Sequence, residues 1–264
     1  MKRNVLVFSV LTIALLAMGL SFPQANAQEA PAAADAVYLD EPAPAPEPAV
    51  AQEGPVKEEY EPGKVRVERN VRKMSDDQIV NHGKFTEYYR NAQKFAEGSY
   101  DNGVHEGPWS FWHENGQLSK TVNFKKGVPD GAWEVFRADG TMMSKRGYKN
   151  GKRDGAWVSL AEDGETPIME QTYVDGALNG DVAVYFKSGK PKVRTTFKNN
   201  LREGKMVEWD ESGRKLAEAD YVAGKLEGQL IRYAADGTAT AETFRDNKRV
   251  PGSAAPAPAA SETP

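Results

Sequence analysis

An internal repeat with a period of 24 residues occupies residues 83–250 and constrains the fold more than any other feature of this sequence. Its marker is a pair of glycines separated by three residues and followed by an aromatic or apolar residue, as in GVHEGPW (from Gly103) and GKRDGAW (from Gly151). The second glycine of the marker recurs at Gly107, Gly131, Gly155, Gly180, Gly204 and Gly228. This period predicts about seven supersecondary units, each burying its apolar side against its neighbours.

Each repeat also contains a tight-turn dipeptide such as Asn115-Gly116 or Asp139-Gly140 between short apolar and β-branched runs. Both residues of such a pair tolerate the positive φ of a type I′ turn. We therefore expect the hairpin turn at these pairs, a connecting loop at the two-glycine marker, and strands of about six residues. The predicted fold class is all-β: an elongated, single-layer antiparallel ribbon of repeated β-hairpins with disordered termini.

Aromatic residues recur in columns with the same period. The regular positions include Trp109, Trp112, Trp133, Phe136, Tyr148, Trp157, Tyr173, Tyr185, Trp209 and Tyr221. These columns favour the packing core of the stacked hairpins, with a row of rings that stacks on sugars or peptides as the alternative. Trp109 and Trp112 are three residues apart, which places them on opposite faces of a regular strand. We expect a bulge to bring them to one face, the alternative being aromatics on both faces.

The N-terminal 27 residues resemble a secretory signal peptide. Lys2 and Arg3 precede an apolar run from Val5 to Leu20, and Ala-Asn-Ala before Gln28 is a small-x-small cleavage pattern. We expect cleavage after Ala27 and a periplasmic or extracellular protein. The alternative is an N-terminal membrane anchor, for which the apolar run is short.

Composition predicts the remaining boundaries. Residues 28–63 contain nine acidic residues and one lysine among many alanines and prolines, which is typical of a disordered linker. Residues 64–82 form a lead-in, in which Ser75 to Gln78 resembles a helix-capping box and predicts a short helix. The repeat domain covers residues 83–250, and a disordered Pro/Ala tail covers residues 251–264.

Residue chemistry argues against an enzyme or a metalloprotein. The 264-residue chain has no cysteine, three histidines (His82, His105 and His113) and no motif of a hydrolase elbow, a zinc protease, a nucleotide-binding loop or an EF-hand. We therefore predict no catalytic residue, cofactor or metal site. The net charge of −4 argues against a nucleic-acid partner.

An acidic column precedes the second marker glycine in most repeats. Its members are Glu106, Asp130, Asp154, Glu203 and Glu227, with Asn179 in the remaining repeat. The column favours a structural role in turns, and a row of carboxylates that attracts cations or basic partners is the alternative.

The run YKNGKRDGAW, from Tyr148 to Trp157, followed by an Asp-Gly turn resembles the MORN repeat, and more closely the variant found in bacterial YwqK-family antitoxins. The resemblance covers about residues 83–248 through its period and glycine placement. It implies an all-β ribbon of hairpins, a membrane- or protein-interaction role, and, through the antitoxin label, neutralisation of a partner.

These observations together predict a non-enzymatic exported scaffold that binds another envelope protein. The first alternative is a lipid- or glycan-binding surface at the membrane or cell wall, carried by Trp109, Trp133, Trp157 and neighbouring lysines such as Lys125, Lys126, Lys149 and Lys152. The second is an antitoxin-like neutralising protein.

Overall fold

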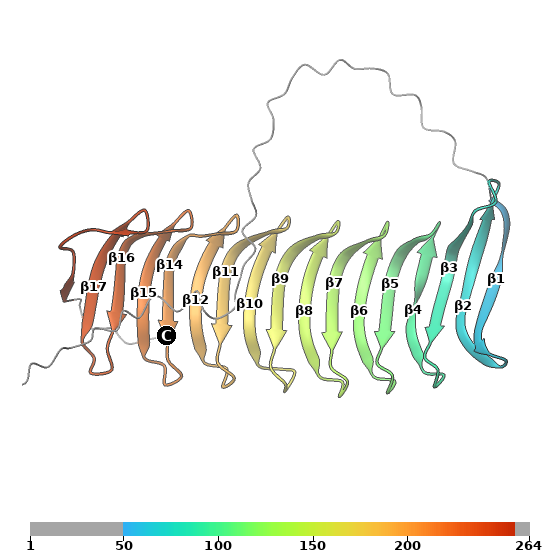
Figure 1. The fold of residues 1–264 in the computed structure, drawn as a ribbon, viewed down its shortest axis with the longest axis horizontal. Coiled ribbons are helices and arrows are strands. Elements are labelled where there is room, and N and C mark those ends of the chain that lie inside the picture. Colours follow the sequence, from blue (N-terminus) through green and yellow to red (C-terminus); the bar gives the residue numbers. More distant parts are fainter. Residues whose placement is uncertain (1–49, 257–264) are drawn as a thin grey trace, which may run out of the picture. The chain divides into compact units, whose positions relative to one another are not determined.

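The computed structural model describes residues 50–256, which form one antiparallel β-sheet in which consecutive strands pair (Figure 1). The expected signal peptide, residues 28–49 of the expected linker and residues 257–264 of the expected tail lie outside the described residues. The strands are β1 (Val50–Glu61), β2 (Lys64–Met74), β3 (Ile79–Tyr88), β4 (Lys94–Asp101), β5 (Val104–Trp112), β6 (Leu118–Lys125), β7 (Val128–Phe136), β8 (Met142–Lys149), β9 (Lys152–Leu160), β10 (Pro167–Val174), β11 (Ala177–Tyr185), β12 (Pro191–Lys198), β13 (Leu201–Arg202), β14 (Gly204–Trp209), β15 (Lys215–Val222), β16 (Lys225–Tyr233), β17 (Ala239–Arg245), β18 (Lys248–Arg249) and β19 (Ala255–Pro256).

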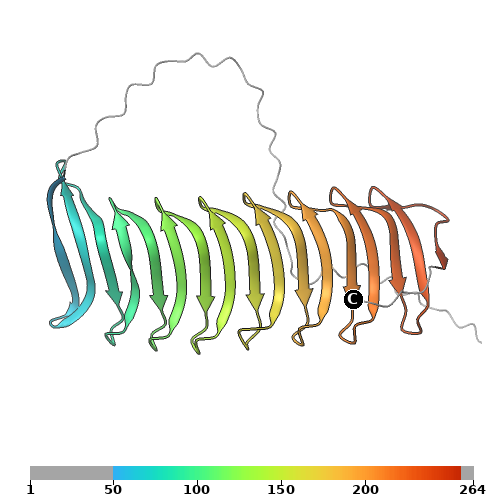
Figure 2. The same ribbon diagram turned by 180° about the vertical axis from the view of Figure 1, so that it is seen from behind.

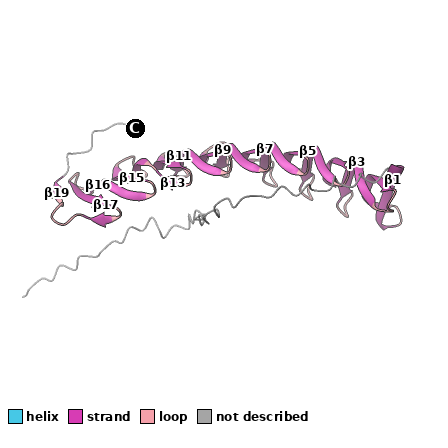
Figure 3. Ribbon diagram, turned by 90° about the horizontal axis from the view of Figure 1, so that it is seen from above, coloured by secondary structure: helices cyan, strands magenta, loops and turns pink. Residues whose placement is uncertain are grey.

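The sheet confirms the predicted all-β ribbon of sequential hairpins. Its strands are bowed, as both face-on views show (Figures 1 and 2), and they lie in a single row with no second layer when seen from above (Figure 3). No helix that could cross a membrane is present between residues 50 and 256.

Two kinds of turn alternate along the sheet, and their positions correct the expected assignment. The first marker glycine lies in a two-residue turn with positive φ at both positions, as at Asn102 (45°) and Gly103 (85°), which is the type I′ geometry. The Asn-Gly pair at residues 115–116 instead lies in a three-residue turn, in which Gly116 N–H donates to the His113 carbonyl (2.8 Å) and only the glycine has positive φ (85°). Asn115 contributes its side-chain oxygen, which accepts a hydrogen bond from Gln117 N–H (3.0 Å).

The first glycine of the marker therefore lies in a turn, whereas the rest of the marker, through the second glycine, is strand and not loop. In β4 and β5, Glu97 pairs with Ser110 and Ser99 pairs with Glu106, so a single residue, Gly98, faces three residues of β5. Gly107, whose φ is 70°, is the first of the three residues in this bulge. The same irregularity follows at the next marker glycines, which have φ values between 79° and 121°: Gly131, Gly155, Gly180, Gly204 and Gly228.

The segment before the repeats is also more ordered than predicted. Residues 50–61, expected within the disordered linker, form the edge strand β1, which pairs with β2. Half-buried side chains of β1 contact the neighbouring strands. Tyr60 O–H donates to the Tyr88 carbonyl (2.9 Å), and Glu58 forms an ion pair with Arg69 (2.7 Å). Composition did not predict this strand, because proline and glutamate are typical of disordered segments. Both are nevertheless tolerated at the edge of a sheet, where Pro55 lies. In the expected tail, Ala255–Pro256 forms β19 against β17.

The predicted helix at residues 75–78 is wrong. Asp77 has a φ of 66°, and its N–H donates to the Met74 carbonyl (3.0 Å), which closes a three-residue turn between β2 and β3. The Asp76 carboxylate accepts a hydrogen bond from Gln78 N–H (3.2 Å) within this turn. The acidic side chain thus stabilises a turn through the same kind of contact that would cap a helix.

One face of the sheet carries most of the buried side chains. Trp109 is 2% exposed and packs on Ala96 and Val122, with Phe85 and Phe111 around them. The Trp109 ring lies directly over Gly98, so that a Cβ at residue 98 would overlap it, and its indole N–H donates to the Ser99 carbonyl (3.0 Å). A single-layer sheet buries this ring because aromatic neighbours on adjacent strands cover it.

Gly98→Ala is expected to lower the stability of the protein by about 1–3 kcal/mol because the added methyl group displaces the Trp109 ring. Thermal unfolding followed by circular dichroism measures the effect. Gly54→Ala in β1 is the matched control, since no atom lies within 4 Å of the added Cβ. Equal melting temperatures for the two variants would contradict the packing described.

Ser144→Ala is expected to raise the stability by about 1 kcal/mol, because the Ser144 side chain is 2% exposed and no described residue hydrogen-bonds its hydroxyl. Denaturant unfolding compares it with Ser159→Ala, the half-buried serine paired with it across β8 and β9. A loss of stability in Ser144→Ala would contradict this expectation, because it would show that the hydroxyl forms a stabilising hydrogen bond.

Candidate interaction surface

The aromatic columns of the repeats divide between the two faces of the sheet. β5 and β6 pair regularly from Gly107 to Phe111, and the register shift between Phe111 and Trp112 adds its extra residue, Ser119, to β6 and not to β5. The two tryptophans therefore point to opposite faces, and the bulge expected to bring them together is wrong in that respect. The residues singled out from the sequence do not form one surface.

We call the face that carries Trp109 the aromatic face. Direct strand pairs place the following residues of β5 to β12 in its middle row: Trp109, Val122, Trp133, Arg146, Trp157, Gln171, Val182 and Thr195. A second row contains Phe111, Lys120, Val135, Ser144, Ser159, Met169, Val184 and Val193. A third row, nearer the two-residue turns, contains His105, Phe124, Pro129, Tyr148, Arg153, Tyr173, Leu178 and Phe197.

The two ends of the middle row are buried by packing. At the N-terminal end, Trp109 is surrounded by the rings of Tyr100 (5.1 Å between centroids), His105 (4.4 Å) and Phe111 (5.9 Å). At the C-terminal end, the middle row continues with buried aliphatic side chains, Met206 and Leu230. The middle row is therefore buried at both ends.

The centre of the middle row is different, because its two tryptophans, Trp133 and Trp157, are half-buried and flank a cation. We define the cation–aromatic patch as Lys120, Trp133, Arg146, Tyr148, Arg153 and Trp157. Lys120 lies 5.2 Å from the Trp133 ring centre, and Arg146 lies 5.3 Å from that of Trp157. Such contacts are favourable, and the rings remain accessible from the sheet surface.

The cations of the patch lack carboxylate partners. All charged residues in the three rows from β5 to β12 are basic. No residue between 50 and 256 forms a hydrogen bond or an ion pair with the side chain of Lys120 or Arg146. Burial lowers the pKa of Lys120. Arg153, in contrast, donates to the Tyr173 hydroxyl (3.0 Å).

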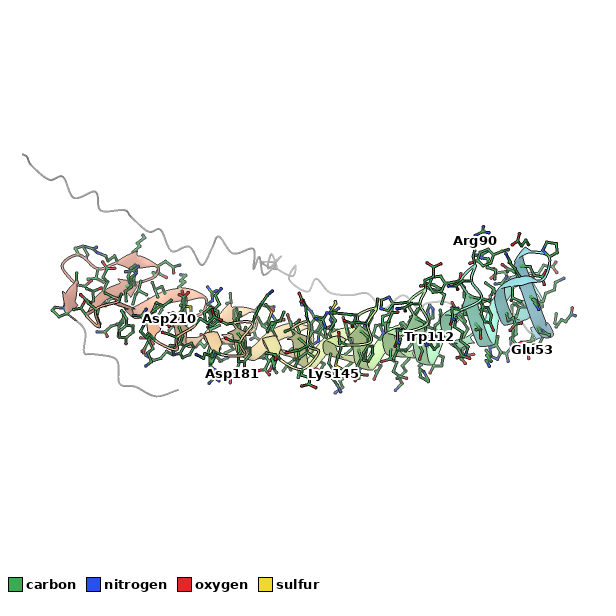
Figure 4. The ribbon with its side chains drawn as sticks, turned by 90° about the horizontal axis from the view of Figure 1, so that it is seen from below. Glu53, Arg90, Trp112, Lys145, Asp181 and Asp210 are labelled. Atoms are coloured by element: carbon green, nitrogen blue, oxygen red, sulfur yellow. The ribbon has the colours of Figure 1, made fainter. Side chains whose placement is uncertain are left out.

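On the opposite face, neighbouring charges compensate each other. Lys145 lies 3.1 Å from Glu134, and Lys94 lies 2.7 Å from Glu97. Tyr185 O–H donates to Glu170 (2.6 Å). Lys145 and Asp181 occupy this face, and their side chains lie along the same margin of the sheet in Figure 4. The opposite face thus carries both acidic and basic side chains, and ion pairs or hydroxyl groups satisfy the carboxylates named here.

The opposite face also carries the second aromatic column, which includes Trp112, Phe136, Tyr185 and Trp209. These residues lie at strand ends beside the three-residue turns, where Trp112 pairs with Leu118 and Phe136 with Met142. Lys94 lies 5.5 Å from the Trp112 ring centre.

The acidic column has the structural role that was favoured. Each carboxylate accepts a hydrogen bond from the backbone N–H that begins the two-residue turn of the next repeat. The five pairs are Glu106 with Lys126 (2.7 Å), Asp130 with Asn150 (3.2 Å), Asp154 with Asp175 (3.1 Å), Glu203 with Ala223 (2.8 Å) and Glu227 with Asp246 (2.8 Å).

The histidines are tied into the packing of the sheet. His105 stacks on Phe124 (4.8 Å between ring centres), and a ring nitrogen of His113 lies 3.0 Å from the Phe136 carbonyl. His82 Nδ1 accepts a hydrogen bond from Asn102 N–H (3.4 Å). In the part of the chain that the structure describes, no three His, Asp or Glu side chains gather as metal ligands would.

Sequence reasoning missed Lys120, Arg146 and Arg153, which give the patch its charge. It singled out lysines near the turns instead, among them Lys152, which lies 2.8 Å from Asp175. The available signal was alternation: Arg146 precedes Tyr148 by two residues, so both share a face if the intervening strand is regular.

The stability of the protein is expected to decrease between pH 7 and pH 5 through His105. Burial lowers the pKa of His105, and the charge of Lys120 lowers it further. The unfolded imidazole binds a proton near pH 6.5, whereas the folded one binds it only at lower pH. The contribution of neutral His105 to the free energy of unfolding is therefore fully present above pH 6.5 and is lost as the pH falls.

Melting temperatures at pH 7 and pH 5 test this contribution. His105→Phe keeps a ring between Tyr100 and Phe124 and should reduce the difference between the two temperatures. An unchanged difference would contradict the pKa shift.

Comparison with known families supports the repeat assignment. A search of curated proteins finds no match to the chain. Residues 106–126 and 178–199 match the model of the MORN repeat variant. These segments contain β5–β6 and β11–β12, two hairpins of the same sheet. The chain therefore contains repeats of the MORN repeat variant.

Proposed function

We propose that this protein is a non-enzymatic, exported scaffold that binds another envelope protein through the aromatic face. The observation that carries the proposal is the difference between the two faces. The cation–aromatic patch has half-buried rings and cations without carboxylates, whereas Lys145 on the opposite face forms an ion pair with Glu134. Accessible aromatic and arginine side chains are typical of the energetically dominant residues of protein interfaces.

Export is part of the proposal and rests on the N-terminal sequence. The positive start, the apolar run and the Ala-Asn-Ala pattern support removal of residues 1–27. N-terminal sequencing of the protein recovered from the bacterial envelope or medium should begin at Gln28. An N-terminus at Met1 in the membrane fraction would support the retained anchor.

Binding to separated envelope fractions tests the function. The protein should be retained by detergent-extracted membrane proteins and not by protein-free vesicles or purified cell wall. Retention on vesicles would favour the lipid-binding alternative, and retention on cell wall would favour the glycan-binding one. The neutralising role implied by the YwqK resemblance would appear as binding to one toxic protein.

Paired variants show which face is used. Trp133→Leu with Trp157→Leu should abolish most of the retention, because both rings belong to the patch. The control, Trp112→Leu with Trp209→Leu, removes two tryptophans from the opposite face and should leave retention unchanged. Circular dichroism spectra confirm that both proteins are folded. Equal retention of the two double variants would contradict the proposal.

A further inference from the structure

We propose that the cation–aromatic patch recognises an acidic, proline-rich segment in the polyproline II conformation. This inference rests on the proposed function and specifies the chemistry of the partner. The first argument is spacing. Trp133 on β7 and Trp157 on β9 lie in the same row, two strands apart, because both pair with Arg146 on β8. Strands about 4.8 Å apart separate the two positions by about 9.6 Å.

A polyproline II helix repeats over nearly the same distance. It has three residues per turn and rises about 3.1 Å per residue, which gives about 9.3 Å per turn. A segment lying across the strands would therefore present an equivalent residue to Trp133 and to Trp157. Aromatic surfaces commonly bind proline-rich segments in this preformed conformation.

Hydrogen bonding distinguishes Trp133 from the other tryptophans of its column. The indole N–H groups of Trp109 and Trp157 donate to the carbonyls of Ser99 (3.0 Å) and Gly147 (2.9 Å). The corresponding group of Trp133 has no such partner between residues 50 and 256. It is available to donate to a backbone carbonyl of a bound segment.

Charge indicates that the segment is acidic. Arg146 lies between Trp133 and Trp157 in the middle row, and Lys120 lies beside Trp133 in the second row. Both are half-buried and lack a carboxylate, so that a carboxylate of the partner would form charge-assisted hydrogen bonds at little further desolvation cost. An acidic residue at every third position of the bound segment would face the same side of the polyproline II helix and would lie over successive repeats of the sheet.

The polar groups of the face favour a peptide over a glycan. Sugar hydroxyls need donors and acceptors beside the stacking rings, but Ser144 and Thr195 are buried (2% and 7% exposed) and no carboxylate is present in these rows. A proline-rich segment needs fewer hydrogen-bond acceptors on the protein, because each proline lacks an N–H. An anionic polysaccharide is therefore the competing outcome of the test.

Titration of the full chain with synthetic peptides tests this inference. Four repeats of Glu-Pro-Ala should quench tryptophan fluorescence and bind at least tenfold more tightly than four repeats of Lys-Pro-Ala. Four repeats of Glu-Gly-Ala, which keep the charge without the proline conformation, should bind several-fold more weakly. Equal affinity for all three, or binding of polygalacturonate alone, would overturn the inference.

Adjacent residues of β8 provide the matched variants. Arg146→Ala should weaken binding of the Glu-Pro-Ala peptide at least tenfold, whereas Lys145→Ala, on the opposite face, should leave it unchanged. Trp133→Phe keeps an aromatic ring but removes the N–H, and it should weaken binding several-fold. Arg146→Glu with Lys120→Glu should reverse the preference toward the Lys-Pro-Ala peptide. Unchanged affinity in Arg146→Ala would contradict the inference.

The two proposals fail in different ways. If the Trp133 and Trp157 variants lose retention on envelope proteins but no proline-rich peptide binds, only the partner chemistry is wrong. If retention on envelope proteins is also independent of these tryptophans, the proposed use of the aromatic face is wrong as well.

Discussion

The register between successive hairpins depends on hydrogen bonds that each two-residue turn makes with the preceding repeat. Gly127 N–H donates to the His105 carbonyl (2.9 Å), and Gly151 N–H donates to the Pro129 carbonyl (2.8 Å). A carboxylate of the preceding repeat binds the neighbouring N–H of the turn, as Glu106 does for Lys126. The bulge at Gly107 gives the strand the local shape that brings these groups within reach. Because a shift of one residue would reverse every side chain, these contacts determine which residues share a face.

That register produces two chemically different faces from one repeated sequence. Lys145 and Arg146 are adjacent in β8, yet Lys145 lies 3.1 Å from a carboxylate of the opposite face and Arg146 stacks on Trp157. Alternation along a strand is sufficient to separate them. In the middle row of the described strands, only the centre combines half-buried rings with a cation that lacks a carboxylate, because Trp109 is buried at one end and aliphatic residues such as Met206 are buried at the other.

The sequence was sufficient to predict the repeat, the all-β class and the strand-by-strand order, because glycine spacing and aromatic columns follow the period directly. It was not sufficient to assign the turns. Asn115-Gly116 and Asn102-Gly103 look alike as dipeptides, but only the second has positive φ at both residues. Which type of turn forms at such a dipeptide depends on the pairing of the two strands that the turn connects. β1 was missed because proline and glutamate are typical of disordered linkers but are also tolerated in an edge strand. The patch was missed because pairing between strands, which the bulges determine, places Lys120 and Arg146 beside the tryptophans.

The central claim is that binding uses the aromatic face alone, and site-specific blocking tests it most directly. The chain has no cysteine, so Ser159→Cys and Val158→Cys each create a single labelling site. These neighbours in β9 are both half-buried and lie on opposite faces, with Ser159 paired to Ser144 and Val158 to Lys145. A bulky maleimide at residue 159 should abolish retention on envelope proteins, and the same label at residue 158 should not. Equal retention of the two labelled proteins, or loss only with the label at residue 158, would contradict the account.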